Sequence, residues 1–181
     1  MADIKLVKLE AENLELVRNW RNSEEVSKYM YTSDFISEQD QIKWFNKIKE
    51  DTTCMYWIIE YDNKKLGLAS IYSISKVFDS CTWAFYLGDT SIRGAGIGSK
   101  VEYNVLSYVF ETLKLNKLNC TVFPSNESVI KMHEGFGFRR EAYFRQHVLK
   151  DGNHIDVVGL AMLKSEWFTI KDYMYNKIYK K

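Results

Sequence analysis

Hydrophobic and polar positions change their spacing several times along the chain, and each change marks an expected element. Residues 4–9 alternate apolar and polar side chains like a half-buried strand, and residues 14–20 then place Leu14, Val17 and Trp20 at helical spacing. The sequence Ser-Glu-Gln-Asp from Ser37 is a variant of the capping box. It predicts a second amphipathic helix that ends near Glu50.

The middle of the chain has the pattern of a hairpin, a third strand and a long helix. Residues 54–61 and 66–74 are rich in β-branched, aromatic and other apolar side chains and are separated by Asp-Asn-Lys-Lys, which predicts two antiparallel strands. Residues 82–87 predict another strand. Apolar residues at helical intervals then predict a helix of about four turns that starts near Ser99.

The remaining residues continue in the same style. We expect a strand over 117–123, a short helix over 127–134, a glycine turn over 135–138, and two strands over 142–149 and 155–163 joined by Lys-Asp-Gly-Asn. The aromatic tail, with Trp167, Phe168, Tyr173 and Tyr175, should pack back on the body. Strands and helices do not alternate strictly, which favours an α+β fold with a mixed sheet over a doubly wound one.

Length and composition favour a single domain over residues 1–181. The chain has one proline, and its 25 Lys and Arg balance 24 Asp and Glu to give a net charge of +1. Such a balance gives no general attraction to nucleic acid or to an anionic membrane, so we expect a small-molecule partner. No apolar run reaches the roughly 18 residues of a membrane span.

Cysteine usage points to a reducing compartment. Cys54, Cys81 and Cys120 are too far apart for a Cys-x-x-Cys pair, and the chain has no signal-like start. We therefore expect a cytoplasmic protein in which all three cysteines are reduced core residues of strands.

Glycines recur at every second position from Gly94 to Gly98, between a predicted strand and a predicted helix. This spacing does not fit the dinucleotide fingerprint G-x-G-x-x-G, and residue 118 is a leucine where an acidic residue is needed. It also fails the nucleoside triphosphate loop, because Ser99 precedes Lys100. Free N–H groups at a helix N-terminus, together with small residues, still form a cradle for a pyrophosphate.

Arg93-x-x-Gly96-x-Gly98 resembles the acetyl-coenzyme A (acetyl-CoA) signature of the GNAT acetyltransferases. Asn126, Ile130, His133 and the Gly-Phe-Gly-Phe ending are similar to the second motif of that family. The expected order of elements also matches the GNAT fold, which implies a mostly antiparallel central sheet of about seven strands with flanking helices. Acetyl-CoA is then the co-substrate, and no metal is expected.

Residues 21–45 resemble a narrower group, the nucleotide-sugar acetyltransferases of pseudaminic acid biosynthesis. An Arg-Asn pair, a Met-Tyr pair and an Ile-Ser helix start recur there at this spacing, although Gln41 stands where that group tends to have histidine and Asp34 resembles an insertion. The resemblance implies direct acetylation of the 4-amino group of UDP-4-amino-4,6-dideoxy-N-acetyl-β-L-altrosamine or a similar sugar. For the oligomeric state, the hypothesis is a homodimer.

The resemblance implies roles on the cofactor side. Backbone N–H groups near Tyr86 or Leu87 would polarise the thioester carbonyl, and Asn126 would contact the cofactor, unless it only caps the following helix. The pyrophosphate would lie on amides of the glycine stretch, which comprises Arg93, Gly94, Ala95, Gly96, Ile97, Gly98 and Ser99.

Two residues are candidates for proton transfer. His133 matches a position at which relatives carry a tyrosine near the coenzyme sulfur, and an imidazole can protonate a departing thiolate at neutral pH. Residues 82–87 lack the glutamate that several family members use as general base. Ser70 matches a serine that lies near the amine in the sugar-modifying relatives, so the resemblance implies that it could relay the proton of the amine through water. A packed histidine and a structural serine are the alternatives.

The acceptor would lie against Arg21, Met30, Tyr31 and Trp44, with Tyr86 completing an apolar wall. Tyr29, Met30 and Tyr31 cannot all face inward from one strand or helix, so some should face a ligand. Two alternatives remain at this point: acetylation of ribosomal-protein N-termini or polyamines by an enzyme of the same superfamily, and a non-catalytic acyl-CoA binding module.

Overall fold

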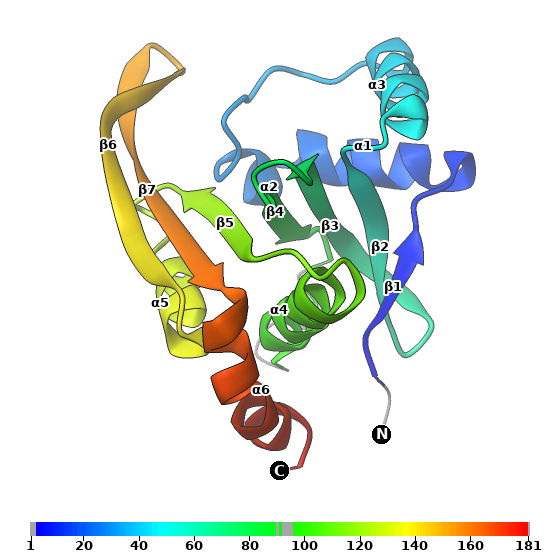
Figure 1. Ribbon diagram of the computed structural model, residues 1–181. Helices are drawn as coiled ribbons and strands as arrows, with labels where there is room; N and C mark the ends of the chain where they lie inside the picture. Colours follow the sequence, from blue (N-terminus) through cyan, green and yellow to red (C-terminus); the bar gives the residue numbers. More distant parts are fainter. Residues whose placement is uncertain (1–2, 90, 92–95, 181) are drawn as a thin grey trace.

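The computed structural model describes residues 3–89, 91 and 96–180. Seven strands form one sheet in the order β1-β2-β3-β4-β5-β7-β6, with helices on both faces (Figure 1). The predicted fold class and number of strands are therefore confirmed. Arg93, Gly94 and Ala95 of the predicted pyrophosphate cradle lie outside the described residues.

The first half of the chain builds one side of the sheet and the helices above it. Its elements are β1 (Lys5–Lys8), a 3-10 turn (Ala11–Asn13), α1 (Leu14–Asn22), α2 (Glu24–Ser27), α3 (Glu38–Glu50), β2 (Met55–Tyr61), β3 (Lys64–Ser75) and β4 (Ser80–Leu87). Ser37 caps α3 as predicted, because its side chain accepts a hydrogen bond from the Asp40 amide. Asp62 and Asn63 adopt positive φ angles, which form the tight turn expected between β2 and β3.

The second half completes the sheet and covers its other face. Its elements are α4 (Ile97–Ser107), a π turn (Tyr108–Thr112), β5 (Lys117–Val122), α5 (Glu127–Phe136), β6 (Arg139–Lys150), β7 (Asn153–Leu163) and α6 (Lys164–Tyr179). The predicted long helix begins at Ile97 rather than near Ser99, and its last turn is a π turn. None of the described helices is long and apolar enough to cross a membrane.

Two layers of buried side chains hold these helices on the sheet. Val17, Trp20 and Phe45 pack with Ile58 and Leu68 between the α1–α3 side and the sheet. A larger core lies beneath α4 and α6 on the opposite face and includes Val101, Phe110, Leu118 and Trp167. The β4–α4–β5 crossover spans this second core and makes β4 and β5 parallel.

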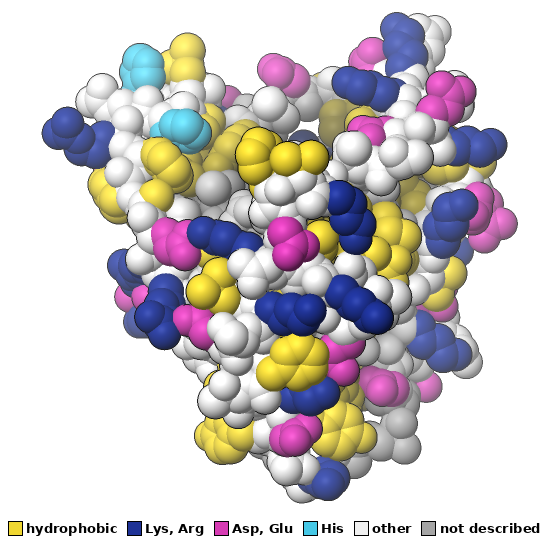
Figure 2. Space-filling model, viewed as in Figure 1, with side chains coloured by type: hydrophobic (Ala, Val, Ile, Leu, Met, Phe, Trp, Pro, Cys, Tyr) yellow, Lys and Arg dark blue, Asp and Glu magenta, His cyan; other side chains and the backbone are white. Residues whose placement is uncertain are grey.

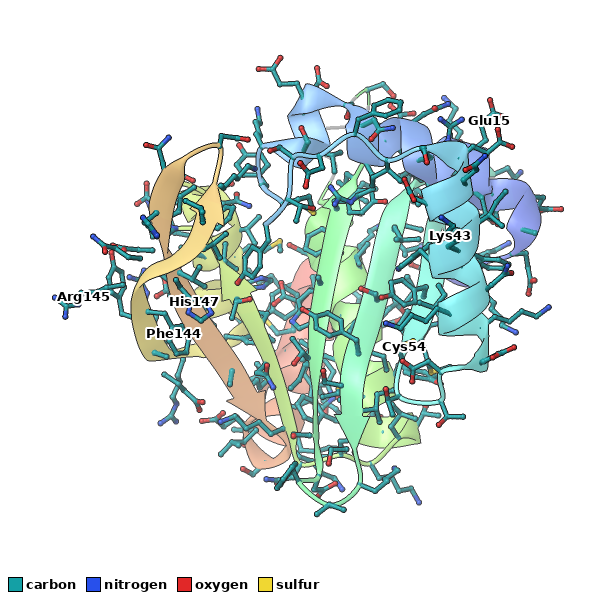
Figure 3. The ribbon with its side chains drawn as sticks, turned by 90° about the horizontal axis from the view of Figure 1, so that it is seen from above. Glu15, Lys43, Cys54, Phe144, Arg145 and His147 are labelled. Carbon is teal, nitrogen blue, oxygen red and sulfur yellow. The ribbon has the colours of Figure 1, made fainter. Side chains whose placement is uncertain are left out.

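The structure corrects two expectations. Cys81 and Cys120 are buried in strands, but Cys54 is half-buried and precedes β2, on the α3 side of the molecule (Figure 3). The aromatic tail forms α6, in which Trp167 is fully buried and donates to Glu111 Oε1 at 3.1 Å. Phe168, Tyr173 and Tyr175 are exposed, because only part of the circumference of this helix, with Trp167 and Met174, is buried.

Candidate active site

The central feature of the sheet is the point at which β4 and β5 separate. Only Ser80, Cys81 and Thr82 of β4 pair with β5, and every other neighbouring pair of strands is antiparallel. Beyond Thr82, no strand of the described residues lies beside one edge of β4, so backbone N–H and C=O groups over residues 83–87 face a gap. This edge can bind an extended ligand.

A cavity of about 660 Å³ occupies this gap. Its walls come from the β4 edge, the end of β5, α5 and residues 25–31, and the molecular surface is hollowed between the β6–β7 hairpin and α3 (Figure 2). The lining is mostly apolar and aromatic and includes Tyr86 and Leu87, the residues predicted to face the thioester. A volume of this size accommodates a small-molecule ligand.

The glycines at the start of α4 have distinct physical roles. Gly96 is the N-cap at φ +71°, a left-handed conformation that other residues rarely adopt. Gly98 lines the cavity, and a Cβ atom there would lie 3.0 Å from Met132 Sδ, so a side chain would narrow the passage between α4 and α5. Ile97 is buried and Ser99 half-buried. This end of α4 presents amide groups beside the cavity.

Asn126 also lines the cavity, at the N-terminus of α5. It occupies the N-cap position, but its side chain makes no capping hydrogen bond to the helix. The backbone carbonyl alone receives the amides of Val129 and Ile130, at 3.1 and 3.2 Å. The Asn126 side chain is therefore available to a ligand, apart from a hydrogen bond of 3.4 Å donated by Ser128.

His133 lies in the cavity wall and forms a buried pair with Glu102 of α4. His133 Nδ1 is 2.8 Å from Glu102 Oε1, and the two side chains are 3% and 0% exposed. Burial by itself lowers the pKa of His133, but the Glu102 carboxylate, together with Cys120, outweighs it and raises that pKa to about 10. Burial also raises the pKa of Glu102. The pair therefore retains a proton in the folded protein, and Glu102 favours the protonated form of His133.

The opposite wall is the segment that follows α1. Tyr29, Met30 and Tyr31 all line the cavity, as their sequence pattern suggested. Tyr31 crosses to the end of β5, where its hydroxyl donates to Thr121 Oγ1 at 2.7 Å and its ring lies 5.3 Å from that of Phe123.

Three residues predicted for the acceptor or for proton transfer, Arg21, Trp44 and Ser70, do not line the cavity. Ser70 pairs with Ala84 inside the sheet, and its hydroxyl donates to the Ala84 carbonyl at 3.4 Å. Trp44 packs edge-on against Tyr56 at 5.0 Å, between α3 and the sheet. The reason is that α3 covers the β2 side of the sheet, whereas the gap opens between β4 and β5.

Arg21 and Tyr86 each have a buried polar atom that has no hydrogen-bond partner among the described residues. These atoms are Arg21 Nη1 and the Tyr86 hydroxyl oxygen. Burial lowers the pKa of Arg21 and raises that of Tyr86. Buried unpaired donors are costly, and of these two side chains only Tyr86 lines the cavity.

A sequence profile of the acetyltransferase (GNAT) domain matches residues 3–139. The chain belongs to the GNAT acetyltransferase family. The protein is accordingly an N-acetyltransferase, and the non-catalytic alternative is set aside.

Several named acetyltransferases are similar to this chain. Acetyltransferase PseH of Campylobacter jejuni is 25% identical over 126 residues, which cover 70% of this chain and 76% of that protein. Spermidine N(1)-acetyltransferase of Vibrio cholerae is 22% identical over 167 residues, 92% of this chain and 96% of that one. The crystal structure of the Vibrio cholerae spermidine N-acetyltransferase with CoA and spermine has a TM-score of 0.86 at 21% identity and covers 92% of this chain and 98% of that one.

Sequence reasoning missed two residues of this GNAT site. Glu102 lies next to Val101 on the buried side of α4, and a carboxylate at such a position signals a buried partner. Glu25 is the one carboxylate among the described residues that line the cavity, and nothing in its local sequence distinguishes it from a solvated helix residue.

Proposed function

We propose that this acetyltransferase moves the acetyl group of acetyl-CoA directly to the amine of a nucleotide-linked amino sugar. The observation that carries the proposal is the cavity at the β4–β5 gap, which has the α4 N-terminus and Asn126 on one side and a wall of tyrosine and methionine on the other. A donor and an acceptor can meet there across the unpaired edge of β4.

The proposed binding of the donor, acetyl-CoA, depends mainly on backbone N–H groups. Amides at the start of α4 suit the pyrophosphate of the coenzyme, because a helix N-terminus favours a negative charge. Gly98 leaves space beside Met132, and the free β4 edge offers N–H groups to the pantetheine and to the thioester carbonyl. The Asn126 amide faces the same space.

His133 is our candidate for the acid that protonates the departing thiolate. The neutral amine attacks the thioester carbon, the carbon–sulfur bond breaks, and the sulfur takes a proton while the product amide loses one. An imidazolium with a pKa near 10 carries that proton at neutral pH, and Glu102 maintains its charge. The base remains open, because Ser70 already donates to a carbonyl inside the sheet.

The proposed class of acceptor, an amino sugar, is inferred from the side chains that line the cavity. Tyrosine and methionine side chains suit a deoxy sugar with a methyl group, whereas a polycation would favour several carboxylates. Glu25 alone provides one among the described lining residues. The unpaired Tyr86 hydroxyl in the cavity wall suits an oxygen-rich group of the acceptor.

Acetylation of a polyamine is the second candidate. It is favoured by the match to a spermidine N(1)-acetyltransferase over 92% of this chain, a longer match than that to PseH. Glu25 would then receive the ammonium group of the acceptor.

Release of free CoA thiol distinguishes these candidates. Acetyl-CoA is incubated with the enzyme and UDP-4-amino-4,6-dideoxy-N-acetyl-β-L-altrosamine, spermidine or a ribosomal N-terminal peptide in separate reactions, and thiol is measured with a chromogenic disulfide. We expect turnover with the sugar nucleotide. Turnover with spermidine or the peptide alone would reject the sugar proposal. A His133→Phe variant with unchanged turnover from pH 6 to pH 10 would remove His133 from the mechanism.

A further inference from the structure

Lys150 is a buried lysine at the tip of the β6–β7 hairpin, and none of the assigned roles uses it. Its side chain is folded inward, and only 8% of the residue is exposed. The ammonium group donates to the carbonyl oxygens of Ser27, Lys28 and Met30 at 2.7, 3.1 and 2.8 Å. These three acceptors match the three protons of an ammonium group.

The three carbonyls belong to the end of α2 and the turn after it. Carbonyls at a helix C-terminus have no partner in the helix and carry partial negative charge, so a buried cation there is strongly held. The same stretch supplies Tyr29, Met30 and Tyr31 to the cavity. Lys150 therefore fixes the backbone of the proposed acceptor wall, although it lies about 120 residues further along the chain.

The contact of Lys150 also stabilises the β6–β7 hairpin itself. β5 pairs with β7 only from Val158 to Leu163, so no strand of the described residues pairs with residues 153–157 of β7 on that side, and the hairpin projects beyond the sheet (Figure 1). A two-stranded ribbon is marginally stable alone. Its tip lies beside the loop that follows α2 (Figure 3), and a Ser33–Asp151 hydrogen bond of 2.5 Å joins the two segments again.

We propose that Lys150 is a positioning residue that fastens the hairpin tip to residues 27–31 and thereby sets the width of the acceptor side of the cavity. Lys150 Nζ also lies 5.7 Å from the centre of the Phe123 ring, which packs against the Tyr31 ring at a tilt of 30°. Lys150 therefore acts on Tyr31 in two ways, through the backbone of the preceding Met30 and through the ring of Phe123. The acceptor's identity rests on the proposed function, but the fastening itself does not.

A Lys150→Met variant tests the proposal, because it keeps an unbranched side chain that is only one heavy atom shorter and removes all three donors. We expect KM for the acceptor to rise about tenfold or more and KM for acetyl-CoA to change less than about twofold. Lys150→Arg should recover part of the loss. Lys76→Met is the matched control, since Lys76 donates to the Leu113 carbonyl at 3.1 Å on an exposed part of the surface.

Hydrogen exchange of the amides of residues 27–31 provides a readout that needs no acceptor. We expect these amides to exchange faster in Lys150→Met than in wild type and in Lys76→Met. Unchanged exchange, or an equal loss for both substrates, would overturn the proposal. If Lys150→Met does not fold, Ser33→Ala takes its place and should raise the acceptor KM about twofold to threefold, and an unchanged KM would count against the fastening.

The outcomes separate this inference from the proposed function. If wild type does not acetylate the sugar nucleotide, the sugar proposal fails, and the kinetic test is run with whichever amine of the panel releases thiol. Faster exchange of residues 27–31 in Lys150→Met would still support the fastening in that case.

Discussion

Replacing Glu102 by Gln should destabilise the protein in a way that depends on pH. The change keeps the shape of the side chain and a hydrogen-bond acceptor for His133 Nδ1, which lies 2.8 Å from Glu102 Oε1, but it removes the negative charge. Without that charge, burial dominates and lowers the pKa of His133. His133 is then neutral at neutral pH.

The size of the effect follows from the pKa of His133. The difference between about 10 and the ordinary 6.5, at about 1.4 kcal/mol per pH unit, corresponds to about 5 kcal/mol at most. Breaking a buried ion pair from one side costs about 3–5 kcal/mol, and the residual hydrogen bond to Gln places the expected loss near the lower value.

The sign of the pH dependence is fixed by the raised pKa. A group whose pKa is higher in the folded state contributes its full stability below pH 6.5 and loses it as the pH rises through about 10. Glu102→Gln should therefore lower the free energy of unfolding most at pH 6 and least at pH 10. Turnover near neutral pH should fall as well, because the proton that we assign to the thiolate is absent.

Urea denaturation at pH 6 and pH 10 measures these differences, with Glu127→Gln as the matched control. Glu127 Oε1 is also 2.8 Å from its partner, Lys131 Nζ, but that pair is exposed and its loss should leave stability nearly unchanged. If Glu102→Gln unfolds at the same urea concentrations as wild type at both pH values, no ionised pair is held between α4 and α5.

Three further changes test the cavity. Gly96→Ala should cost about 1–2 kcal/mol in thermal or urea denaturation because of the positive φ, whereas Gly135→Ala, in α5 with open space around its Cβ, should be neutral or stabilising. Gly98→Val should raise KM for acetyl-CoA more than KM for the acceptor, since the side chain would meet Met132, and equal increases would contradict the assignment. Tyr31→Phe should raise the acceptor KM about twofold to tenfold through loss of the Thr121 hydrogen bond, with KM for acetyl-CoA as the internal reference.

Local sequence was enough to predict most of the elements. The periods of apolar residues gave all seven strands and the helices that became α1, α3, α4 and α5, because alternation and helical spacing are imposed by the geometry of each element itself. Ser37 marked the start of α3, because its side chain accepts a hydrogen bond from the amide of Asp40, only three residues further along the chain. The α6 helix was missed because its aromatic residues are spread around the helix rather than along one face.

Gly96 and Gly98 are residues of the site that sequence indicated by itself, since the positive φ of Gly96 and the close approach at Gly98 depend on a few consecutive residues at the start of α4. The pairs that complete the site are distant in sequence. His133 and Glu102 are 31 residues apart, Tyr31 and Thr121 are 90 apart, and Lys150 and Met30 are 120 apart. Such contacts depend on how strands and helices are stacked, which no local pattern encodes. Only the tertiary structure therefore decided that Glu102 lies beside His133, that Trp44 and Ser70 lie away from the cavity, and that Lys150 at the hairpin tip contacts the carbonyls of Ser27, Lys28 and Met30.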